Sequence, residues 1–523
     1  FVRVHRTLAY LLHLFLQHGV HEFAIHDLLE FLGVPAERCL AVHRNAVADE
    51  LLRGLALGNE IFFSVDFPVI NPFCVRVHFD LLTLARKAQL VHGLAVLFTD
   101  SLCLRALFVE NTGYFSDFFA GNERPVSTTM AFVSMLRKLL ADPEVGRLIV
   151  PIVPDEARTF GMEGLFRQVG IYSATGQKYD PVDADALLYY KEAQDGQILE
   201  EGITEAGSIA SFMAAGTAYA THGINTIPFF IYYSMFGMQR VGDFVWAAGD
   251  MRCKGFLIGG TAGRTTLAGE GLQHQDGHSH ILASVAPTLK CYDPAFAYEM
   301  AVIIHDGIRR MYEEQEDVFY YLTVGNENYP MPPMPDHKNI REGILKGMYK
   351  FRASPRTDLE YHAELLGGGA IMNEVIKAQK MLEEYGVSAD VWSVTSYKEL
   401  RSEALEVERW NMLHPGVKPR TPYVTRCFSR EDGVVVAASD YLKLLPDGIH
   451  KWVPNGLTSL GTDGFGRSES RESLRDFFEV DARYITLTAL CALAKRGRMS
   501  AAVAQKAMRE LDISPDKISP MTA

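Results

Sequence analysis

The chain has 523 residues, a net charge of −13 at pH 7 and a hydrophobic content of 48%. This length exceeds what one ordinary hydrophobic core accommodates, so about two to four domains are expected. The charged content of 22% is typical of a folded protein and excludes wholesale disorder. Because nucleic acids and anionic membranes require a basic surface, the acidic balance argues against both as partners.

The cysteines and the apolar runs indicate the compartment. Seven cysteines are scattered, and none has the C-x-x-C spacing, which favours a reducing cytoplasm over a disulfide framework or a zinc site. No apolar run reaches the roughly 18 residues that span a bilayer. The stretch from Leu8 to Leu16 has the apolar character of a signal peptide, but His13 interrupts it and no small-residue cleavage pattern follows. We therefore expect a cytoplasmic protein.

The composition changes near residue 125. All eighteen methionines and all four tryptophans lie at Met130 or later, whereas residues 1–120 contain one lysine and eight of the seventeen histidines. Two interpretations compete: a divergent helical domain poor in methionine, or a wrong-frame or unrelated stretch joined to a truncated gene. We favour the second and draw no function from residues 1–120. It predicts few contacts between this segment and the remainder, and poorly packed apolar surface on it.

Beyond this seam, helical and strand patterns alternate. Ser127 or Thr128 can cap a helix that extends to about Asp142. The other elements expected in this part are strands at 148–153, 227–233, 255–258, 289–292 and 318–324, and helices at 160–169, 205–220, 241–251 and 294–314. Strands that alternate with helices predict a parallel sheet covered on both faces.

A proline-rich stretch at 329–335 (YPMPPMP) is typical of a linker, and a second alternating unit follows it. The expected elements there are a strand near Leu365, a helix ending near Glu384, a strand at 389–394, and helices near 470–478, 482–496 and 500–511. The chain therefore divides into an unassigned segment, residues 1–124, and two α/β domains, residues 125–330 and 331–523.

Ligands of parallel α/β sheets bind beyond the carboxyl ends of the strands, so polar residues placed there are candidates for a site. Asp155 and Glu156 follow the strand at 148–153, and Tyr233 and Phe236 follow the strand at 227–233. The loop after 255–258 leads to three histidines, His274, His278 and His280. Glu205 begins a predicted helix, where the helix dipole favours a carboxylate.

Each of these residues also has an ordinary structural interpretation. Asp155 or Glu156 can be a helix cap or a surface charge, and Tyr233 and Phe236 can belong to the core. The three histidines have a spacing compatible with a metal, but no second ligand cluster supports it, so no metal site is predicted. The string GGTAGRTT lacks the spacing of a phosphate-binding loop. Pattern alone indicates an α/β enzyme of unidentified substrate.

Long strings make the interpretation more specific. They are STTMAFV (127–133), PDEARTFGMEGLFRQVGIYS (154–173), QILEEGITEAG (197–207), PFFIYYSMFGMQRVGDFVWAAGD (228–250), GEGLQHQDGHSH (269–280) and LGTDGFGRSESRESLRDFFEVD (460–481). From about Pro125 to Ala523 the chain resembles the homodimeric pyruvate dehydrogenase family. The resemblance implies a thiamine-diphosphate-binding domain of the pyrimidine type, with a parallel sheet, followed by a transketolase C-terminal-like α/β domain.

The resemblance also implies roles for single residues. Glu205 is similar to the glutamate that hydrogen-bonds N1′ of the thiamine aminopyrimidine, which lets the neighbouring amino group act as an internal base. Phe236 resembles the aromatic residue that stacks on the pyrimidine, and Ile203 lines the same pocket. The family's active-site positions that orient pyruvate, handle protons and steady the covalent intermediate are matched by Asp155, Glu156, Tyr233 and His274.

The implied reaction is oxidative decarboxylation of pyruvate with reductive acetylation of the lipoyl group of dihydrolipoyl acetyltransferase, in a homodimer. The family's first domain, which holds Mg²⁺ and the diphosphate through a G-D-G motif, has no counterpart, and no G-D-G occurs in the sequence. Two hypotheses follow. The chain is the pyrimidine half of a thiamine-diphosphate-dependent enzyme completed by a separate domain, or it is an inactive fragment that only dimerises.

Overall fold

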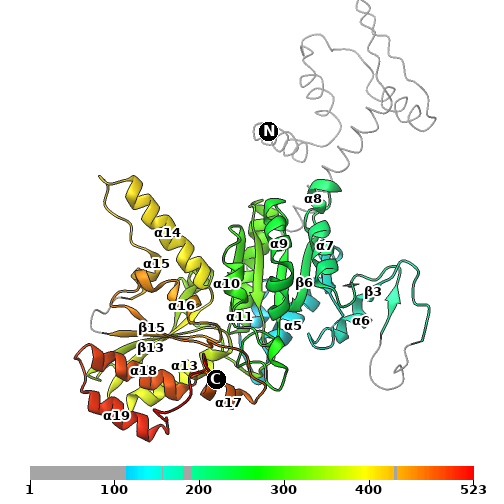
Figure 1. Cartoon of the computed structure of the whole chain (residues 1–523). Helices are drawn as coiled ribbons and strands as arrows, with labels where there is room; N and C mark the ends of the chain where they lie inside the picture. The colour runs from blue at the N-terminus through cyan, green and yellow to red at the C-terminus, as the bar shows by residue number, and fades with distance from the viewer. Residues whose placement is uncertain (1–112, 156, 181–189, 429–432) are drawn as a thin grey trace, which may run out of the picture. The chain divides into compact units, whose positions relative to one another are not determined.

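The computed structural model describes residues 113–155, 157–180, 190–428 and 433–523 (Figure 1). These described residues belong to one compact unit. The sequence hypotheses about residues 1–112 therefore lie outside the described residues. Tyr114 and Phe115 are buried in the core of the compact unit, and Lys138 pairs with Asp117 at 2.5 Å. The packed unit thus begins before the seam that the composition predicts.

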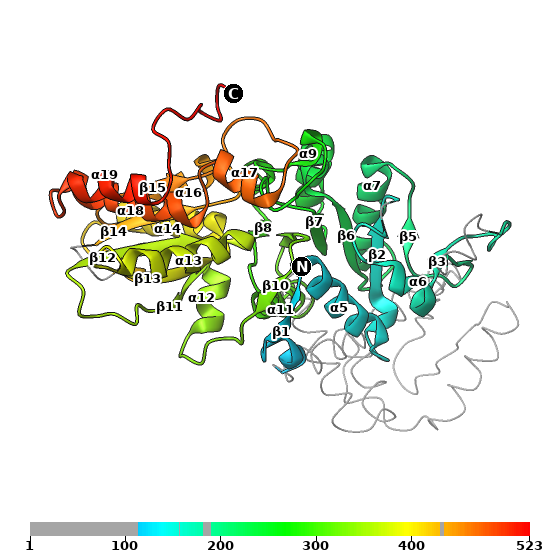
Figure 2. The ribbon, with the colours of Figure 1, turned by 90° about the horizontal axis from the view of Figure 1, so that it is seen from below.

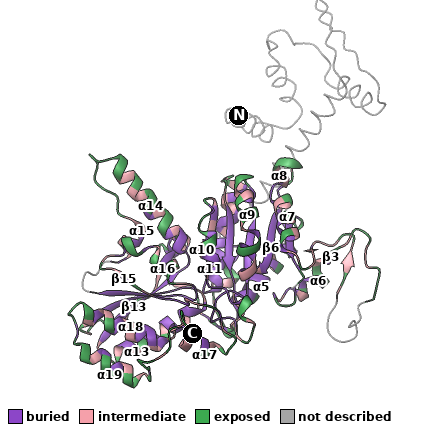
Figure 3. Ribbon diagram, in the orientation of Figure 1, coloured by how far each residue is buried: buried purple, intermediate pink, exposed green. Residues whose placement is uncertain are grey.

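A six-stranded parallel sheet organises the first half of this unit. Its strand order is β5-β2-β6-β7-β9-β8, and every neighbouring pair is parallel. The bounds are β2 (Ile149–Val153), β5 (Leu199–Glu200), β6 (Ile227–Tyr233), β7 (Phe256–Gly260), β8 (Leu289–Tyr292) and β9 (Phe319–Thr323). The central strands are continuous apolar runs because both faces of the sheet are covered, as the purple strands of Figure 3 show.

Helices cover this sheet on both faces. Figure 2 shows α5 (Thr128–Ala141) and α11 (Ala297–Ile308) on one face, with α7 (Glu205–Gly216) and α9 (Ser234–Asp250) on the other. The predicted cap of α5 is Ser127, whose hydroxyl oxygen accepts from the Met130 N–H at 3.2 Å. Shorter helices are α6 (Glu163–Val169), α8 (Ala218–Thr221) and α10 (Ser279–Ala283). Within the described residues, no helix is both long and apolar enough to cross a bilayer.

Two elements differ from the sequence prediction. Helix α9 starts at Ser234, seven residues before the predicted start at 241, and Val241 has non-helical dihedrals inside it (φ −127°, ψ 21°). The kink shifts the hydrophobic period, so the sequence pattern reveals only the second segment. Tyr329–Met331, predicted as a linker, forms strand β10, which pairs antiparallel with β1 (Asn122–Val126).

The second half is built on a mixed five-stranded sheet of order β11-β13-β12-β14-β15. Its bounds are β11 (Met348–Arg352), β12 (Tyr361–Gly367), β13 (Val387–Val394), β14 (Val434–Ala438) and β15 (Leu457–Leu460). Only β11 runs antiparallel to its neighbour, which the alternating sequence pattern does not reveal. The helices of this half are α12 (Ile340–Lys346), α13 (Met372–Glu383), α14 (Tyr397–Leu413), α15 (Tyr423–Cys427), α16 (Leu444–Asp447), α17 (Arg471–Phe477), α18 (Ala482–Lys495) and α19 (Ala501–Glu510).

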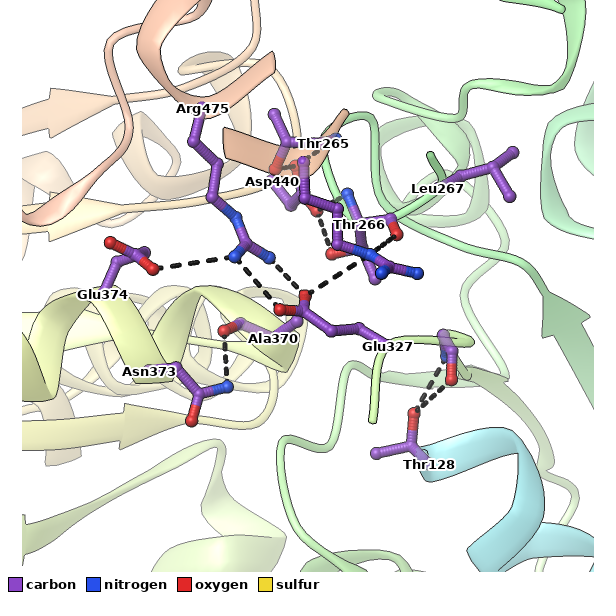
Figure 4. A network of polar contacts seen from close by, with 12 residues as sticks. Thr128, Thr265, Thr266, Leu267, Glu327, Ala370, Asn373, Glu374, Asp440 and Arg475 are labelled. Carbon is purple, nitrogen blue, oxygen red and sulfur yellow. Dashed lines mark hydrogen bonds and ion pairs between the residues drawn. The ribbon is translucent and has the colours of Figure 1, made fainter. Parts of the chain in front are cut away.

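A network of polar contacts joins the two halves (Figure 4). The carboxylate of Asp440, just after β14, accepts hydrogen bonds from the backbone N–H and the hydroxyl of both Thr265 and Thr266, at 2.5 to 3.0 Å. Gly263 (φ +90°) permits this approach, because a Cβ there would lie 2.3 Å from Asp440 Oδ2. Arg475 of α17 also pairs with Glu327. The loop after β7 is therefore fixed by the second half.

We predict that Asp440→Asn loosens this loop. An amide nitrogen cannot accept a hydrogen bond, so buried donors of Thr265 or Thr266 lose their partner, at a cost of about 2 kcal/mol. Hydrogen exchange should show these two amides exchanging roughly thirtyfold faster than in the wild-type chain, the rate equivalent of that energy. Asp250→Asn, an exposed control on α9, should leave their exchange unchanged. Unaltered protection in Asp440→Asn would contradict the assigned role.

Candidate functional site

The candidate site lies at the carboxyl edge of the parallel sheet. Strand β6 ends at Tyr233, next to Gly260 at the end of β7, and Asp155 follows β2. The loop after β7 brings His274 back to this edge. Because the carboxyl ends of parallel strands meet at one edge, residues far apart in the sequence converge there.

Three predicted residues form an aromatic cluster. The ring of Tyr233 lies 5.9 Å from the Phe236 ring and 4.9 Å from the His274 ring, and the Phe236 and His274 rings are 5.0 Å apart. The sequence did not single out Phe160, whose fully buried ring lies 5.2 Å from that of Tyr233. Phe160 fits because Gly260 has no side chain: a Cβ there would meet its ring at 2.4 Å.

Glu205 is the first residue of α7, and its carboxylate is almost entirely buried. Thr204 caps the helix by accepting from the Gly207 N–H at 3.2 Å, and the helix dipole favours the negative charge of Glu205. Both carboxylate oxygens accept from Nη1 of Arg240, at 2.8 and 2.9 Å. The Arg240 guanidinium also lies over the Phe236 ring, 4.1 Å from its centroid. Arg240 thus links Glu205 to the aromatic cluster.

The remaining predicted residues are placed differently. Ile203 is 76% exposed, an unusual position for a large apolar side chain, two residues before the buried Glu205. Asp155 is exposed at the end of β2. Glu156 lies outside the described residues. The rings of Tyr233, Phe236 and His274 therefore lie together. Glu205 is linked to them through Arg240, and Ile203 lies on the surface.

A further acid lies beside Asp155 that the sequence did not indicate. Burial raises the pKa of Glu200, on β5, and the Asp155 carboxylate raises it further, against a hydrogen bond from the Tyr190 hydroxyl at 3.1 Å that lowers it. Only the neighbouring strand ends of β2 and β5 reveal this pair, because nothing in the sequence spacing connects the two residues.

Within the described residues, the three histidines of the loop after β7 are not among the side chains that converge at metal-ligand spacing. His280 is buried against the Thr323 hydroxyl at 2.8 Å, and His278 donates its backbone N–H to Asp276. Within the described part of the chain, the side chains that converge at metal-ligand spacing are His362, Glu364 and Asp390. Each of these already has a partner: Ser388 and Glu364 for His362, Trp392 for Glu364, and Lys350 for Asp390.

Comparisons with known proteins place this geometry in context. Residues 108–332 match a family model described as the pyruvate dehydrogenase E1 component middle domain, and residues 347–481 match a transketolase-like C-terminal domain. The first match begins 17 residues before the predicted start of the resemblance. The chain is 56% identical over 401 residues to the pyruvate dehydrogenase E1 component of Pseudomonas aeruginosa, and 52% identical over 403 residues to that of Escherichia coli K12. Each alignment covers 76% of this chain and 45% of the relative.

Solved structures resemble the fold. The transketolase of Leishmania mexicana matches with a TM-score of 0.52 and 15% identity, over 76% of this chain and 47% of that one. The transketolase of Campylobacter jejuni matches with a TM-score of 0.51 and 14% identity, over 71% of this chain and 47% of that one. At these identities the likeness concerns the fold alone. The chain spans less than half the length of the curated relatives it matches.

The burial of His280 gives a pH prediction. Burial, with the Lys398 ammonium, lowers the pKa of His280 to about 4 against an opposing Asp276 carboxylate. Between about pH 6.5 and 4 the unfolded chain therefore binds a proton that the folded chain excludes. The contribution of His280 to stability is present above about pH 6.5 and is lost as the pH falls towards 4. Burial raises the pKa of Asp293 to about 7, which gives the opposite slope over the same range.

The measurement is therefore a difference between variants. From pH 7 to pH 5, the free energy of unfolding in urea should fall by about 1–2 kcal/mol more for the wild-type chain than for His280→Gln. His222→Gln, at an exposed histidine, should follow the wild type. The same slope for wild type and His280→Gln would show that His280 is not buried in its neutral form.

Proposed function

Because the chain belongs to the pyruvate dehydrogenase E1 family over its middle and C-terminal domains, we propose that it forms the pyrimidine side of a thiamine-diphosphate site that acts on pyruvate. The domain division proposed from the sequence, an unassigned segment 1–124 and domains at 125–330 and 331–523, is part of this proposal. The acceptor of the acetyl group is the lipoyl group of dihydrolipoyl acetyltransferase. The observation that carries the proposal is the near-buried Glu205 carboxylate linked to the face of Phe236.

The residues at this edge fit an aminopyrimidine. Such a ring needs a carboxylate partner for a ring nitrogen and a flat apolar surface for its face. Glu205 offers the first and Phe236 the second. In addition, Nδ1 of His274 is buried without a hydrogen-bond partner, in contact with the rings of Tyr233 and Phe236. An unsatisfied buried nitrogen of this kind favours a ligand that completes its hydrogen bonding.

Each residue has a distinct proposed task. Glu205 hydrogen-bonds N1′ of the pyrimidine through a proton that the carboxyl group and the ring nitrogen share, and Phe236 stacks on the ring. Thiamine diphosphate, when bound, supplies the carbon nucleophile that attacks the pyruvate carbonyl. Tyr233 and His274, at the end of β6 and in the loop after β7, orient pyruvate and hold or move its protons.

In this proposal Asp155 and Ile203 border the bound cofactor. Both side chains are exposed in the chain alone, Ile203 to 76%. In the assembled enzyme, the diphosphate-binding domain and the bound cofactor cover them. A large apolar side chain gains stabilisation from such cover, because exposed apolar area is removed from water.

This chain provides only one wall of the site. The alignments cover 45% of the relatives. We propose that the groups that hold Mg²⁺ and the diphosphate come from a separate diphosphate-binding domain, and that the chain assembles as a homodimer. An inactive fragment is the alternative that the experiments below distinguish.

The chain alone should bind thiamine diphosphate weakly. The Mg²⁺-bridged diphosphate contacts, which supply charge-assisted hydrogen bonds, are not available from the matched residues. We expect calorimetric titration to give a dissociation constant above about 100 μM, with no dependence on Mg²⁺. Micromolar binding that requires Mg²⁺ would mean that residues 1–112 contain a diphosphate site.

Glu205 is the test of the chemistry. When the amino-terminal domain of a full-length relative is added and pyruvate-dependent activity appears, Glu205→Ala should lower kcat by a factor of about 10² to 10⁴, the usual cost of losing positioned acid–base assistance. Glu472→Gln, an exposed glutamate in the first turn of α17, is the matched control and should retain full activity. A fully active Glu205→Ala enzyme would show that another carboxylate, with Glu156 the next candidate, takes this role.

A further inference from the structure

Arg240 makes two contacts that are unusual for a surface cation. Its Nη1 donates to both oxygens of Glu205, at 2.8 and 2.9 Å, and its guanidinium lies 4.1 Å from the centroid of the Phe236 ring. Arg240 and Phe236 are four residues apart on α9, so their side chains lie on one face of the helix. Glu205 comes from the neighbouring helix α7. The guanidinium therefore fills the space between the carboxylate and the aromatic face.

These contacts are those that the proposed function gives to the cofactor. A guanidinium is planar and delocalised, donates N–H groups from its edge, and stacks on aromatic rings. An aminopyrimidine is also planar, and it presents a hydrogen-bonding edge to a carboxylate and a flat face to an aromatic ring. A group that satisfies both Glu205 and Phe236 therefore competes with the pyrimidine for the same two surfaces.

We propose that Arg240 occupies the pyrimidine position in the free chain and is displaced when the cofactor enters. This inference rests on the proposed function, since it takes Glu205 and Phe236 as the pyrimidine contacts. Arg240 is then a gating residue. It neutralises the Glu205 carboxylate and covers Phe236 until the ring arrives, so the incomplete site carries neither an unpaired buried charge nor a bare aromatic surface.

The contact is of a kind that a ligand can displace. The Arg240 side chain is 51% exposed, whereas that of Glu205 is 10% exposed. A single nitrogen, Nη1, serves both carboxylate oxygens, so the pair lacks the two-nitrogen fork that makes arginine–carboxylate pairs strong. An ion pair of this exposure contributes little net stability. Solvent already surrounds half of the side chain, which gives the guanidinium a place to move.

When Arg240 covers the site in part of the molecules, the apparent affinity for the pyrimidine falls in proportion to the fraction of molecules that remain open. When the guanidinium covers the site about nine-tenths of the time, the apparent dissociation constant rises about tenfold above the intrinsic one. Removing the guanidinium should therefore strengthen pyrimidine binding. The direction is decisive, because a residue that merely supports the site would weaken binding when it is replaced.

The experiment titrates the full chain with 4-amino-5-hydroxymethyl-2-methylpyrimidine, a neutral probe that needs no diphosphate domain, and follows ligand resonances by NMR. Arg240→Gln should bind the probe about tenfold more tightly than the wild-type chain. Arg240→Lys keeps the charge near Glu205 but not the planar group over Phe236, and its affinity should lie between the two. Equal or weaker binding by Arg240→Gln would overturn the proposal, as would no binding by either protein up to the solubility of the probe.

A second substitution separates this inference from the proposed function. In the Arg240→Gln background, Glu205→Ala should abolish the gain, because the proposed ring contact is lost. When Glu205→Ala in the wild-type background weakens binding but Arg240→Gln changes nothing, the gate is refuted and the pyrimidine site stands. When neither substitution alters binding, both are refuted. Circular dichroism and thermal unfolding of each variant confirm that the chain remains folded.

Discussion

The four hydrogen bonds that the Asp440 carboxylate accepts are the constraint on which the geometry of the candidate site depends. They fix the loop after β7, which begins at Thr261 and carries His274 back to the sheet edge. Asp440 is itself buried, so each bond it lost would leave a desolvated group unsatisfied. Arg264 reinforces the junction by donating to the Thr462 and Gly464 carbonyls. The second half of the unit therefore positions a residue of the first.

Residues of the second half also contact the loop next to His274. The loop residue next to His274, Gln275, is fully buried, donates to the Leu267 carbonyl and accepts from the Arg467 N–H of the second half. His274 is thus held from the side of the C-terminal domain, whereas Tyr233 and Phe236 are held by β6 and α9.

The sequence predicted that several residues meet at this sheet edge, but it did not indicate Arg240 between them. The resemblance proposed Glu205, Tyr233, Phe236 and His274 as site residues, which stays a prediction, and the parallel-sheet pattern explains why such residues meet. Neither the resemblance nor the pattern indicated Arg240. The predicted helix began at 241, and the kink at Val241 interrupts the hydrophobic periodicity that would have revealed the first segment of α9. Its partner Glu205 lies 35 residues away, a distance that local pattern cannot bridge.

Other differences arise from contacts that local sequence patterns do not encode. The antiparallel strand β11 and the short strand β10 pair through backbone hydrogen bonds to distant segments, and the proline-rich sequence of 329–335 favours a linker interpretation. The spacing of the histidines is compatible with a metal but does not indicate which of them are buried. The buried His280 forms a hydrogen bond with the Thr323 hydroxyl. The change of composition near residue 125 likewise did not predict that Tyr114 and Phe115 pack into the core.

The central claim is that this chain contributes the pyrimidine wall of a composite cofactor site. Hydrogen exchange tests this claim most directly. The full chain is assembled with the amino-terminal domain of a full-length relative and Mg²⁺, and amide exchange is measured with and without thiamine diphosphate. The account predicts that the cofactor adds protection in the first turn of α7, in residues 233–240 and around His274, and leaves the sheet β11–β15 unchanged. Added protection confined to other segments, or none at these three, would contradict it.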